Sequence, residues 1–309
     1  MLYRKIGNSD INASLVGYGA WKAGKEGWSN VQDNETIRAI EFAADNGINY
    51  FDTAPIYGFG HSEILVGKAL KKRREEVYIA TKVGLVWDAN KRVAKNLSKE
   101  SVLKEIDQSL ERMGIDYIDL IQIHWNDNKT PMAEVMEAFT RAQEKGKVRH
   151  LGVCNLGIGP LRNAVKHADL ISSQNLYNMI DRNSEKYLTE NLNYHTENEI
   201  IPFCKEHRMS LIPYSPLGQG FLSESFHPEE FESRDVRNQN SMFEQNKKQR
   251  EQLVEKAHSF GVSLSELAII WLAKQEVIGS IIISSTNQDH IQENILALDK
   301  IDKAAYSEI

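Results

Sequence analysis

The chain has 309 residues, of which 41% are hydrophobic and 26% are charged, a composition typical of a globular protein with a full core. Its 37 basic and 43 acidic residues are interspersed and give a formal net charge of −6, so we expect no extended positive surface and no nucleic-acid partner. The N-terminus lacks the apolar stretch of a signal peptide, and no window approaches the roughly 18 apolar residues of a membrane span, which predicts a soluble, cytoplasmic protein with no membrane partner.

Short runs rich in Val, Ile and Tyr alternate with longer amphipathic stretches, a pattern typical of βαβ units around a parallel sheet. A hairpin is expected first, with strands at 2–6 and 10–13 around the turn at 7–9. Eight strands are then expected near 14–17, 48–52, 77–82, 118–123, 148–153, 171–174, 210–214 and 279–283. Helices are expected at 35–46, 62–71, 98–113, 131–145, 161–167, 199–207 and 289–298, with an extra helix at 248–260 after a long polar loop at 223–248.

This order of elements predicts a (β/α)8 TIM barrel, an α/β fold in which residues 1–309 form a single domain and the hairpin closes the bottom of the barrel. The Asn-Gly pair at 46–47 and the Lys-Gly pair at 145–146 are typical of helix C-termini. A doubly wound fold with a Rossmann nucleotide site is the structural alternative. It is disfavoured because the segments that begin at Gly17 and Gly58 lack the third glycine of the GxGxxG motif.

Polar side chains end three successive strands that are otherwise apolar. Asp52 ends INYFD, Lys82 ends VYIATK and His124 ends LIQIH. Tyr57 follows in the loop just after Asp52. Because the active site of a TIM barrel lies at the carboxyl ends of its strands, and neighbouring strands are only about 4.8 Å apart, we expect these four side chains to converge.

These four residue types suit the reduction of a carbonyl group. A phenol has a pKa of about 10, and we expect the Lys82 ammonium to lower the pKa of Tyr57 so that the tyrosine can donate a proton. Asp52 would be the counter-charge of the buried lysine, and His124 would donate a hydrogen bond to the substrate oxygen. Each residue alone also has an ordinary structural explanation, as a loop cap, an extended lysine, a core histidine or a packed tyrosine. Their convergence favours the catalytic interpretation.

The remaining histidines show neither an HExxH motif nor clustered Cys/His spacing, so we expect no metal site. The two cysteines, Cys154 and Cys204, are far apart in the sequence and fit neither a disulfide framework nor a CxxC site. We expect both to be reduced, partly buried thiols.

At the four converging residues the chain resembles the aldo-keto reductase superfamily. GINYFDTAPIYGFGHSEILVGKAL is similar to the first signature segment of that family, and IATKVG and DYIDLIQIHW are similar to the segments that carry its lysine and histidine. The spacing is most similar to a bacterial branch related to inositol-operon and general-stress reductases and to potassium-channel β-subunits. The resemblance implies reversible, NAD(P)H-dependent reduction of aldehydes or ketones to alcohols, with a hydride from nicotinamide. The implied catalytic residues are Tyr57, Asp52, Lys82 and His124.

The resemblance also implies a cofactor site along GKVRHLGVCN, ISSQNLYN, LIPYSPLGQGFLS and ISSTNQDHIQEN. Asn155 and Gln174 would contact the nicotinamide carboxamide, and Tyr214 would stack on the nicotinamide ring. The pyrophosphate path would be lined by Ser215, Leu217 and Gly218, and the adenosine end by Ser284, Ser285, Thr286, His290, Glu293 and Asn294.

Two departures from the family pattern are visible. Relatives that prefer NADPH usually carry Lys or Arg near positions matching Ser284, Thr286 or His290, and none of these is a fixed cation here. Because hydroxyls and a helix N-terminus can also bind phosphate, we expect NADPH as the cofactor, with weak discrimination against NADH. The second departure is a longer segment at 181–199, in which Tyr187 or Tyr194 is expected to shape the substrate pocket or an oligomer contact.

Three tryptophans, Trp21, Trp87 and Trp125, each follow a strand end. They could equally wall an apolar substrate pocket or anchor loops. Because the sequence shows no charged residue dedicated to the pocket, small aldehydes or ketones are the expected substrates.

Two other functions fit parts of the pattern. The chain could be a cofactor-binding regulatory subunit that senses redox state with little turnover, or an isomerase or aldolase in which Lys82 forms a Schiff base. The intact set of four residues favours the reductase, and Asp52 as an ion-pair partner argues against a neutral, nucleophilic lysine. The sequence leaves the physiological substrate, the direction of the reaction and the oligomeric state open.

Overall fold

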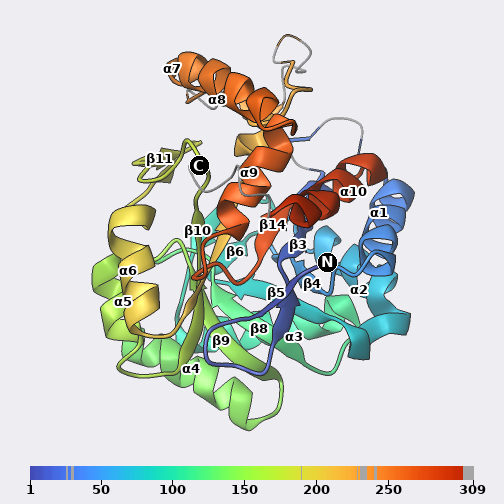
Figure 1. Ribbon diagram of the computed structural model, residues 1–309. Helices are drawn as coiled ribbons and strands as arrows, with labels where there is room; N and C mark the ends of the chain where they lie inside the picture. Colours follow the sequence, from blue (N-terminus) through green and yellow to red (C-terminus); the bar gives the residue numbers. More distant parts are fainter. Residues whose placement is uncertain are drawn as a thin grey trace.

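A computed structural model of the protein describes residues 1–25, 27–28, 31–188, 190–227, 229, 235–239 and 242–301. Eight of its strands are β3 (Val16–Gly19), β4 (Tyr50–Asp52), β5 (Tyr78–Val83), β8 (Ile118–Ile123), β9 (Val148–Cys154), β10 (Leu170–Leu176), β13 (Ser210–Tyr214) and β14 (Ile281–Ile283). They are parallel and lie in the order β13-β10-β9-β8-β5-β4-β3-β14, with helices on the outside (Figure 1). The predicted (β/α)8 barrel is therefore confirmed.

The barrel closes between β13 and the residues that precede β14. The Leu211 amide donates to the Val277 carbonyl at 2.8 Å, and the Gly279 amide donates to the Leu211 carbonyl at 3.0 Å. The strands are buried on both faces, as β8 illustrates with six buried residues in a row. This is why they read as nearly continuous apolar runs in the sequence.

The predicted N-terminal hairpin is formed by β1 (Tyr3–Lys5) and β2 (Asn12–Ser14), which pair in antiparallel fashion. Ile6 and Ile11 of this hairpin are buried in one cluster with Tyr50, Leu120 and other side chains from the barrel strands. Since those side chains come from several different strands, they face the barrel interior. The hairpin thus closes the bottom of the barrel, as expected.

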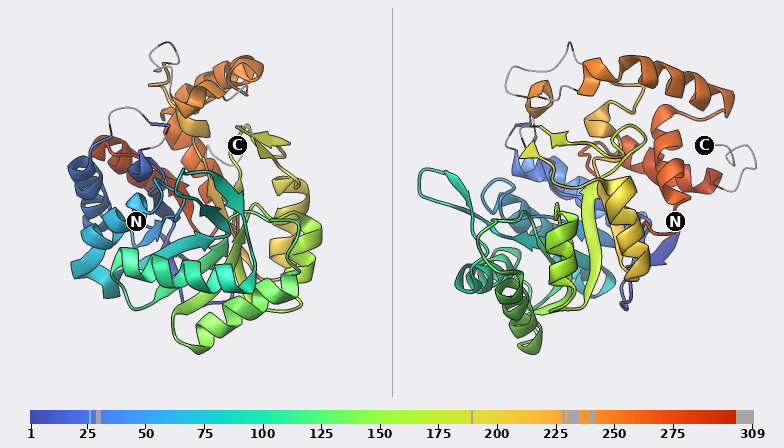
Figure 2. Two further views of the ribbon diagram at one scale, coloured as in Figure 1. Left: turned by 180° about the vertical axis from the view of Figure 1, so that it is seen from behind. Right: turned by 90° about the vertical axis from the view of Figure 1, so that its left-hand side faces the viewer.

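Helices connect the strands and cover the barrel, and Figure 2 shows from two further sides that α3 and α4 lie along its outer surface. Glycines end two of them with left-handed backbone, at Gly47 (φ 87°) and Gly146 (φ 69°), as the sequence predicts. The helices are α1 (Asp33–Asp45), α2 (His61–Leu70), α3 (Lys99–Met113), α4 (Met132–Glu144), α5 (Ile158–Ala164), α6 (Ile201–Glu206), α7 (Met242–Gln245), α8 (Lys247–Ser259), α9 (Leu264–Ala273) and α10 (Gln288–Ala297).

Helix α9 was not predicted from the sequence. Every residue of α9 is buried, so its side chains lack the one-sided apolar period of a surface helix. The available signal was at its start, where Ser263 and Glu266 form a capping box: the Glu266 amide donates to Ser263 Oγ at 3.1 Å and the Ser263 amide to Glu266 Oε2 at 3.0 Å.

Two hairpins that the sequence did not predict lie in loops that follow the carboxyl ends of strands. β6 (Leu85–Trp87) and β7 (Val93–Lys95) follow β5, and β11 (Lys186–Tyr187) and β12 (Glu190–Asn191) follow β10. The Lys95 ammonium donates to Glu190 Oε2 at 3.1 Å, so the hairpins contact each other. The second hairpin lies within the insertion predicted at 181–199.

The polar loop predicted at 223–248 contains a 3-10 turn at Val236–Gln239 and helix α7. Part of that loop, residues 228, 230–234 and 240–241, lies outside the described residues. Within the described part of the chain, none of the helices is both long enough and apolar enough to cross a bilayer.

Candidate active site

Lys82 and Asp52 form a buried ion pair at the carboxyl ends of β4 and β5. The Lys82 ammonium lies 2.5 Å from Asp52 Oδ1, and the two side chains are 0% and 4% exposed. The same ammonium donates to the Thr53 carbonyl at 3.0 Å and to the Tyr57 hydroxyl at 3.5 Å. Asp52 is opposite Ala80 on β5, so Lys82, two residues further along, faces the same side of the sheet. Three of the four predicted catalytic residues are thus in contact.

Burial and the neighbouring charges shift the pKa values of Lys82 and Tyr57 in opposite directions. Burial is the largest single effect and lowers the pKa of Lys82, but the charge and hydrogen bond of Asp52 together with Tyr57 and Cys154 raise it by more, so the pKa is raised overall and the ammonium stays charged. Burial raises the pKa of Tyr57 to about 12, and the charge of Lys82 opposes this only in part. The expectation that Lys82 brings the pKa of Tyr57 below its usual value is therefore wrong in its net sign, because it left out burial. The Tyr57 hydroxyl keeps its proton near neutral pH, which is the state that a proton donor needs.

His124 follows β8, and its ring stands edge-on to the ring of Tyr57, with centroids 5.8 Å apart and an interplanar angle of 85°. Burial lowers the pKa of His124 well below its usual value, and the positive charges of Lys82 and Lys95 lower it further. The imidazole is therefore neutral near pH 7 and carries one N–H donor. A neutral N–H donor beside a protonated phenol suits a site that binds a ligand oxygen through hydrogen bonds.

Gln122 is a residue of the site that the sequence analysis missed. Its side-chain nitrogen donates to Asp52 Oδ2 at 3.2 Å, while its oxygen is buried with no hydrogen-bond partner among the described residues. Since side chains alternate along a strand, Gln122 projects to the same face of β8 as the residue two positions on, His124. That spacing was the available signal in the sequence.

A cavity of about 540 Å³ opens at this end of the barrel. Asp52, Tyr57 and His124 line it, whereas Lys82 reaches the site through Asp52 and Tyr57. The other predicted residues in its wall are Asn155, Gln174, Tyr214, Ser215, Leu217, Ser284, Ser285, His290, Glu293, Asn294, Trp21 and Trp125.

Besides Lys82, three of the described residues predicted for the site are not part of this wall: Gly218, Thr286 and Trp87. Trp87 instead lines a separate cavity of about 450 Å³ beside α3, and its ring lies 5.5 Å from the ring of Phe59. Of the two alternatives considered for these tryptophans, Trp87 therefore does not line the cavity that Trp21 and Trp125 line.

Asn155 is the centre of a hydrogen-bond network in the cavity. Its backbone has left-handed φ of 52° directly after β9, and its side chain is almost fully buried. Its Oδ1 accepts from the Tyr194 and Tyr214 hydroxyls, both at 2.8 Å. Its Nδ2 lies 3.3 Å from the His124 carbonyl oxygen and 3.1 Å from Cys154 Sγ. The amide thus links residues predicted for the cofactor to the strand end that carries His124.

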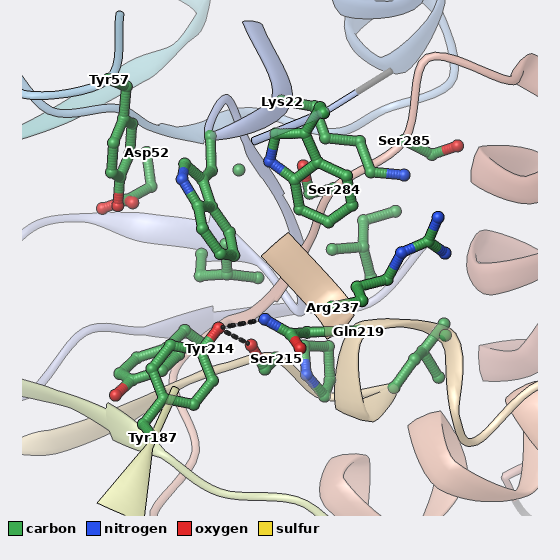
Figure 3. A pocket seen from close by; sticks show the side chains of 18 of the residues that line it. Lys22, Asp52, Tyr57, Tyr187, Tyr214, Ser215, Gln219, Arg237, Ser284 and Ser285 are labelled. Carbon is green, nitrogen blue, oxygen red and sulfur yellow. Dashed lines mark hydrogen bonds between the residues drawn. The ribbon is translucent and has the colours of Figure 1, made fainter. Parts of the chain in front are cut away.

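Tyr187, from the insertion, also lines the cavity. Its hydroxyl lies 2.8 Å from Ser215 Oγ and accepts from Gln219 Nε2 at 3.2 Å, as the dashed lines in Figure 3 show. Its ring lies 5.2 Å from the ring of Tyr214 at an interplanar angle of 68°. The segment at 181–199 therefore contributes to the wall of the site through Tyr187.

Two cations that the sequence analysis did not select, Lys22 and Arg237, line the same cavity (Figure 3). Burial and, to a smaller extent, the charge of Arg237 lower the pKa of Lys22, Asp235 opposes them, and the net value is about 8. Arg237 donates to the two oxygens of Asp235 at 2.9 and 2.7 Å. No local pattern marks Arg237 in the sequence, because it lies within the long polar loop.

The far end of the cavity carries polar atoms that fit a polar ligand. Ser284 Oγ and Asn294 Oδ1 are buried and have no hydrogen-bond partner among the described residues. A buried polar atom without a partner costs free energy, so both would gain from a ligand that supplies one. The start of α10 is already capped, since Asn287 Oδ1 accepts from the amides of Asp289 and His290. In the described chain, no three His, Cys, Asp or Glu side chains are grouped closely enough to hold a metal ion.

The geometry places Asp52, Tyr57 and His124 in a cavity whose wall also carries two cations and several polar side chains. A model of the aldo/keto reductase family matches residues 15–309. The chain belongs to this family. Aldo-keto reductases are oxidoreductases that act on carbonyl compounds with nicotinamide cofactors, and the resemblance seen in the sequence is confirmed.

Individual members of the aldo-keto reductase family are similar over nearly the whole chain. The NADH-specific methylglyoxal reductase of Escherichia coli is 32% identical over an alignment 314 residues long. The alignment covers 95% of this chain and 92% of that protein. The aldo-keto reductase YhdN of Bacillus subtilis is 32% identical over 284 residues, with 89% and 82% covered. The structure of the glycerol dehydrogenase AKR11B4 from Gluconobacter oxydans superposes with a TM-score of 0.81 at 28% identity, covering 97% of this chain and 90% of that one.

Proposed function

We propose that this aldo-keto reductase reduces aldehydes or ketones to alcohols, with a hydride from a bound nicotinamide cofactor and a proton from Tyr57. The observation that carries the proposal is the 3.5 Å contact between the Tyr57 hydroxyl and the Lys82 ammonium, in a cavity that His124 also lines. The carbonyl carbon gains the hydride, and its oxygen gains the proton and becomes a hydroxyl. The same groups serve the reverse reaction.

The four residues have separate tasks in this reaction. When Tyr57 gives up its proton, its oxygen becomes negative next to Lys82, and the attraction stabilises that state. Asp52 keeps Lys82 charged and in place. His124, being neutral, donates a hydrogen bond to the carbonyl oxygen and orients it toward Tyr57. Residues 1–309 would act together as one catalytic domain.

The cofactor, when bound, supplies the hydride, and the residues of the cavity would hold it. Asn155 and Gln174 would contact the nicotinamide carboxamide, and Tyr214 would stack on the ring. Lys22 and Arg237 would face the phosphates, since both are cations in the cavity wall. Ser215 and Leu217 would line the pyrophosphate path, and Ser284, Ser285, His290, Glu293 and Asn294 the adenosine end. Gly218 and Thr286 would support these two segments from outside the wall.

We further propose that the enzyme uses NADPH with weak discrimination against NADH. NADPH carries one more phosphate than NADH, and Lys22 and Arg237 are cations of the cavity wall that would face phosphate groups. The segment at 284–290, by contrast, carries neither Lys nor Arg, and the N-terminus of α10 is already capped by Asn287. The Escherichia coli relative is NADH-specific by name, and this is the observation that weighs toward NADH. Measuring kcat/KM with both cofactors tests this, and a tenfold or greater preference for NADH would contradict it.

The substrate would bind between the aromatic side chains Trp21, Trp125 and Tyr187, which line the cavity together with Tyr57 and His124. A mostly apolar mouth around two donors suits a small aldehyde or ketone. A panel of such carbonyl compounds, followed by the loss of NADPH and NADH absorbance, measures the preference.

The variant Tyr57→Phe tests the assigned proton donor. General acids contribute on the order of 100- to 10,000-fold, so kcat should fall by about that factor while the dissociation constant of the cofactor changes by less than about twofold. Tyr177→Phe is the matched control, because its hydroxyl contacts Glu197 and Gln275 instead of the cavity. Turnover of Tyr57→Phe at the wild-type rate would refute Tyr57 as the acid.

A further inference from the structure

Tyr194 connects the inserted segment to the nicotinamide half of the proposed site. Its side chain is buried, with 3% of its surface exposed. Its hydroxyl donates to Asn155 Oδ1 at 2.8 Å and lies 3.4 Å from the Tyr214 hydroxyl. The Leu176 amide donates to Tyr194 Oη at 3.4 Å. Because Asn155 Oδ1 is the nearer acceptor, at 2.8 Å against 3.4 Å for the Tyr214 hydroxyl, the Tyr194 proton is directed to Asn155.

The surroundings of Asn155 allow one orientation of its amide. Both lone pairs of Oδ1 are used, by Tyr194 and by Tyr214. If the amide were turned over, Oδ1 would lie about where Nδ2 now is, 3.3 Å from the His124 carbonyl oxygen, and two acceptors would face each other. The network therefore holds Asn155 with its nitrogen, a donor only, on the side of His124 and Cys154.

One N–H of Asn155 is available to a stronger acceptor. It points to Cys154 Sγ at 3.1 Å, and a thiol sulfur is a weak acceptor. A carbonyl oxygen that enters the cavity is a stronger acceptor than the sulfur, so the hydrogen bond from Asn155 to this oxygen would be more favourable. The oxygen of Asn155, by contrast, has no lone pair left for a ligand N–H.

We propose that Tyr194 is a positioning residue that orients Asn155, so that Asn155 recognises the oxygen of the nicotinamide carboxamide and makes no contact with its NH2 group. This rests on the proposed function, in which Asn155 faces the carboxamide. Tyr214 shares the task through its hydroxyl, whereas Tyr194 belongs to the insertion at 181–199 and brings that segment into cofactor recognition.

Three reduced cofactors distinguish recognition of the carboxamide oxygen from recognition of its NH2 group. They are NADH, its 3-acetylpyridine analogue, which keeps the oxygen and lacks the NH2 group, and its thionicotinamide analogue, in which sulfur replaces the oxygen. Dissociation constants are measured by fluorescence or calorimetry without a carbonyl substrate. A neutral hydrogen bond contributes about 1 kcal/mol, or roughly fivefold in affinity. Tyr194→Phe should weaken NADH and the acetylpyridine analogue by about that factor and leave the thio analogue nearly unchanged.

Two variants serve as controls for the positioning role. Tyr177→Phe removes another buried tyrosine hydroxyl, which contacts Glu197 of the inserted segment, and should leave all three dissociation constants unchanged. Asn155→Asp keeps an oxygen that accepts from the Tyr194 and Tyr214 hydroxyls and removes the N–H donor of Nδ2. In that background Tyr194→Phe should cause no additional loss, because the two changes act through one interaction.

Equal losses for the three cofactors in Tyr194→Phe, or no loss at all, would overturn the proposal. An additive loss in the double variant would also do so, and this readout holds if either single variant is less stable. Failure of the proposed cofactor site is distinct from these outcomes, since wild-type protein would then bind none of the three dinucleotides. Failure of the proposed reduction alone would leave these dissociation constants measurable and show only as absent turnover.

Discussion

Gln174 donates a hydrogen bond to Asp52 Oδ2 at 2.8 Å, so a side chain expected to contact the cofactor also contacts the carboxylate that holds Lys82. Gln122 donates to the same oxygen at 3.2 Å, while Lys82 occupies Oδ1 at 2.5 Å. Asp52 therefore has three donors, one of which is shared between the catalytic pair and the wall of the cofactor cavity. With the proposed contact between Gln174 and the cofactor, this arrangement would link cofactor binding to the position of Lys82 beneath Tyr57.

Replacing the two glutamines separately should distinguish their contributions. Gln122→Met removes a donor to Asp52 from a residue outside the cavity wall, so kcat should fall about tenfold, equivalent to ~1.4 kcal/mol, with no change in cofactor affinity. Gln174→Met should lower kcat similarly and also weaken cofactor binding. Steady-state kinetics and cofactor titrations measure both effects. Equal cofactor affinities in the two variants would show that Gln174 does not contact the cofactor.

Removing one charge of the Asp52–Lys82 pair should destabilise the protein more than removing both charges. Lys82→Met leaves the Asp52 carboxylate buried without its counter-charge, which typically costs about 3–5 kcal/mol of unfolding free energy. The double variant Asp52→Asn/Lys82→Met removes both charges and should recover most of this loss, because the oxygen of the introduced amide can still accept from Gln122 and Gln174. Denaturant unfolding measures the free energies. Both variants should be inactive, and a double variant no more stable than the single one would contradict the argument.

Most of the fold could be predicted from the sequence, because the barrel strands are buried apolar runs and the surface helices have clear periodicity. Helix α9 could not, since full burial removes the amphipathic pattern, and only its Ser263–Glu266 capping box was visible. The short hairpin β11–β12 lacked any strong turn signal. These elements depend on the tertiary structure that surrounds them.

For the site, the proximity of Asp52, Tyr57, Lys82 and His124 could be predicted because strand ends place them together. Lys22 and Arg237 were not found, since they come from segments far apart in the sequence and meet only through the cavity. The direction of the Tyr57 pKa shift was also mistaken. Proximity of Lys82 could be inferred from strand order, but the larger effect of burial can be read only from the packed structure.

Cofactor preference should respond to a cation at the start of α10. His290 is exposed and lines the cavity, so His290→Arg would place a permanent positive charge there, where it can pair with the 2′-phosphate. The ratio of kcat/KM for NADPH to that for NADH should rise about tenfold. Gln288→Arg is the control, because it adds the same charge to the same helix at a position outside the cavity wall. Equal ratios in the two variants would indicate a general effect of charge.

Glu105 should make the stability of the protein depend on pH. Its Oε2 accepts from the Gly84 amide at 3.0 Å and its Oε1 from the Ser101 hydroxyl at 3.1 Å, yet burial dominates and raises its pKa from 4.5 to about 7. The folded state therefore binds more protons than the unfolded state between these values. It follows that the unfolding free energy falls as pH rises through this window and that the fall ends above about pH 7.

Glu105→Gln keeps both hydrogen bonds, since the amide oxygen can accept from Gly84 and the amide nitrogen can donate to Ser101. It should remove this pH dependence and make the protein more stable than wild type at pH 8, by on the order of 1–3 kcal/mol. Denaturant unfolding of both proteins between pH 5 and 8 gives the difference, in which groups common to both cancel. Glu111→Gln, an exposed position on the same helix, should follow the wild-type curve. A constant difference between Glu105→Gln and wild type across this range would show that Glu105 does not change its protonation there.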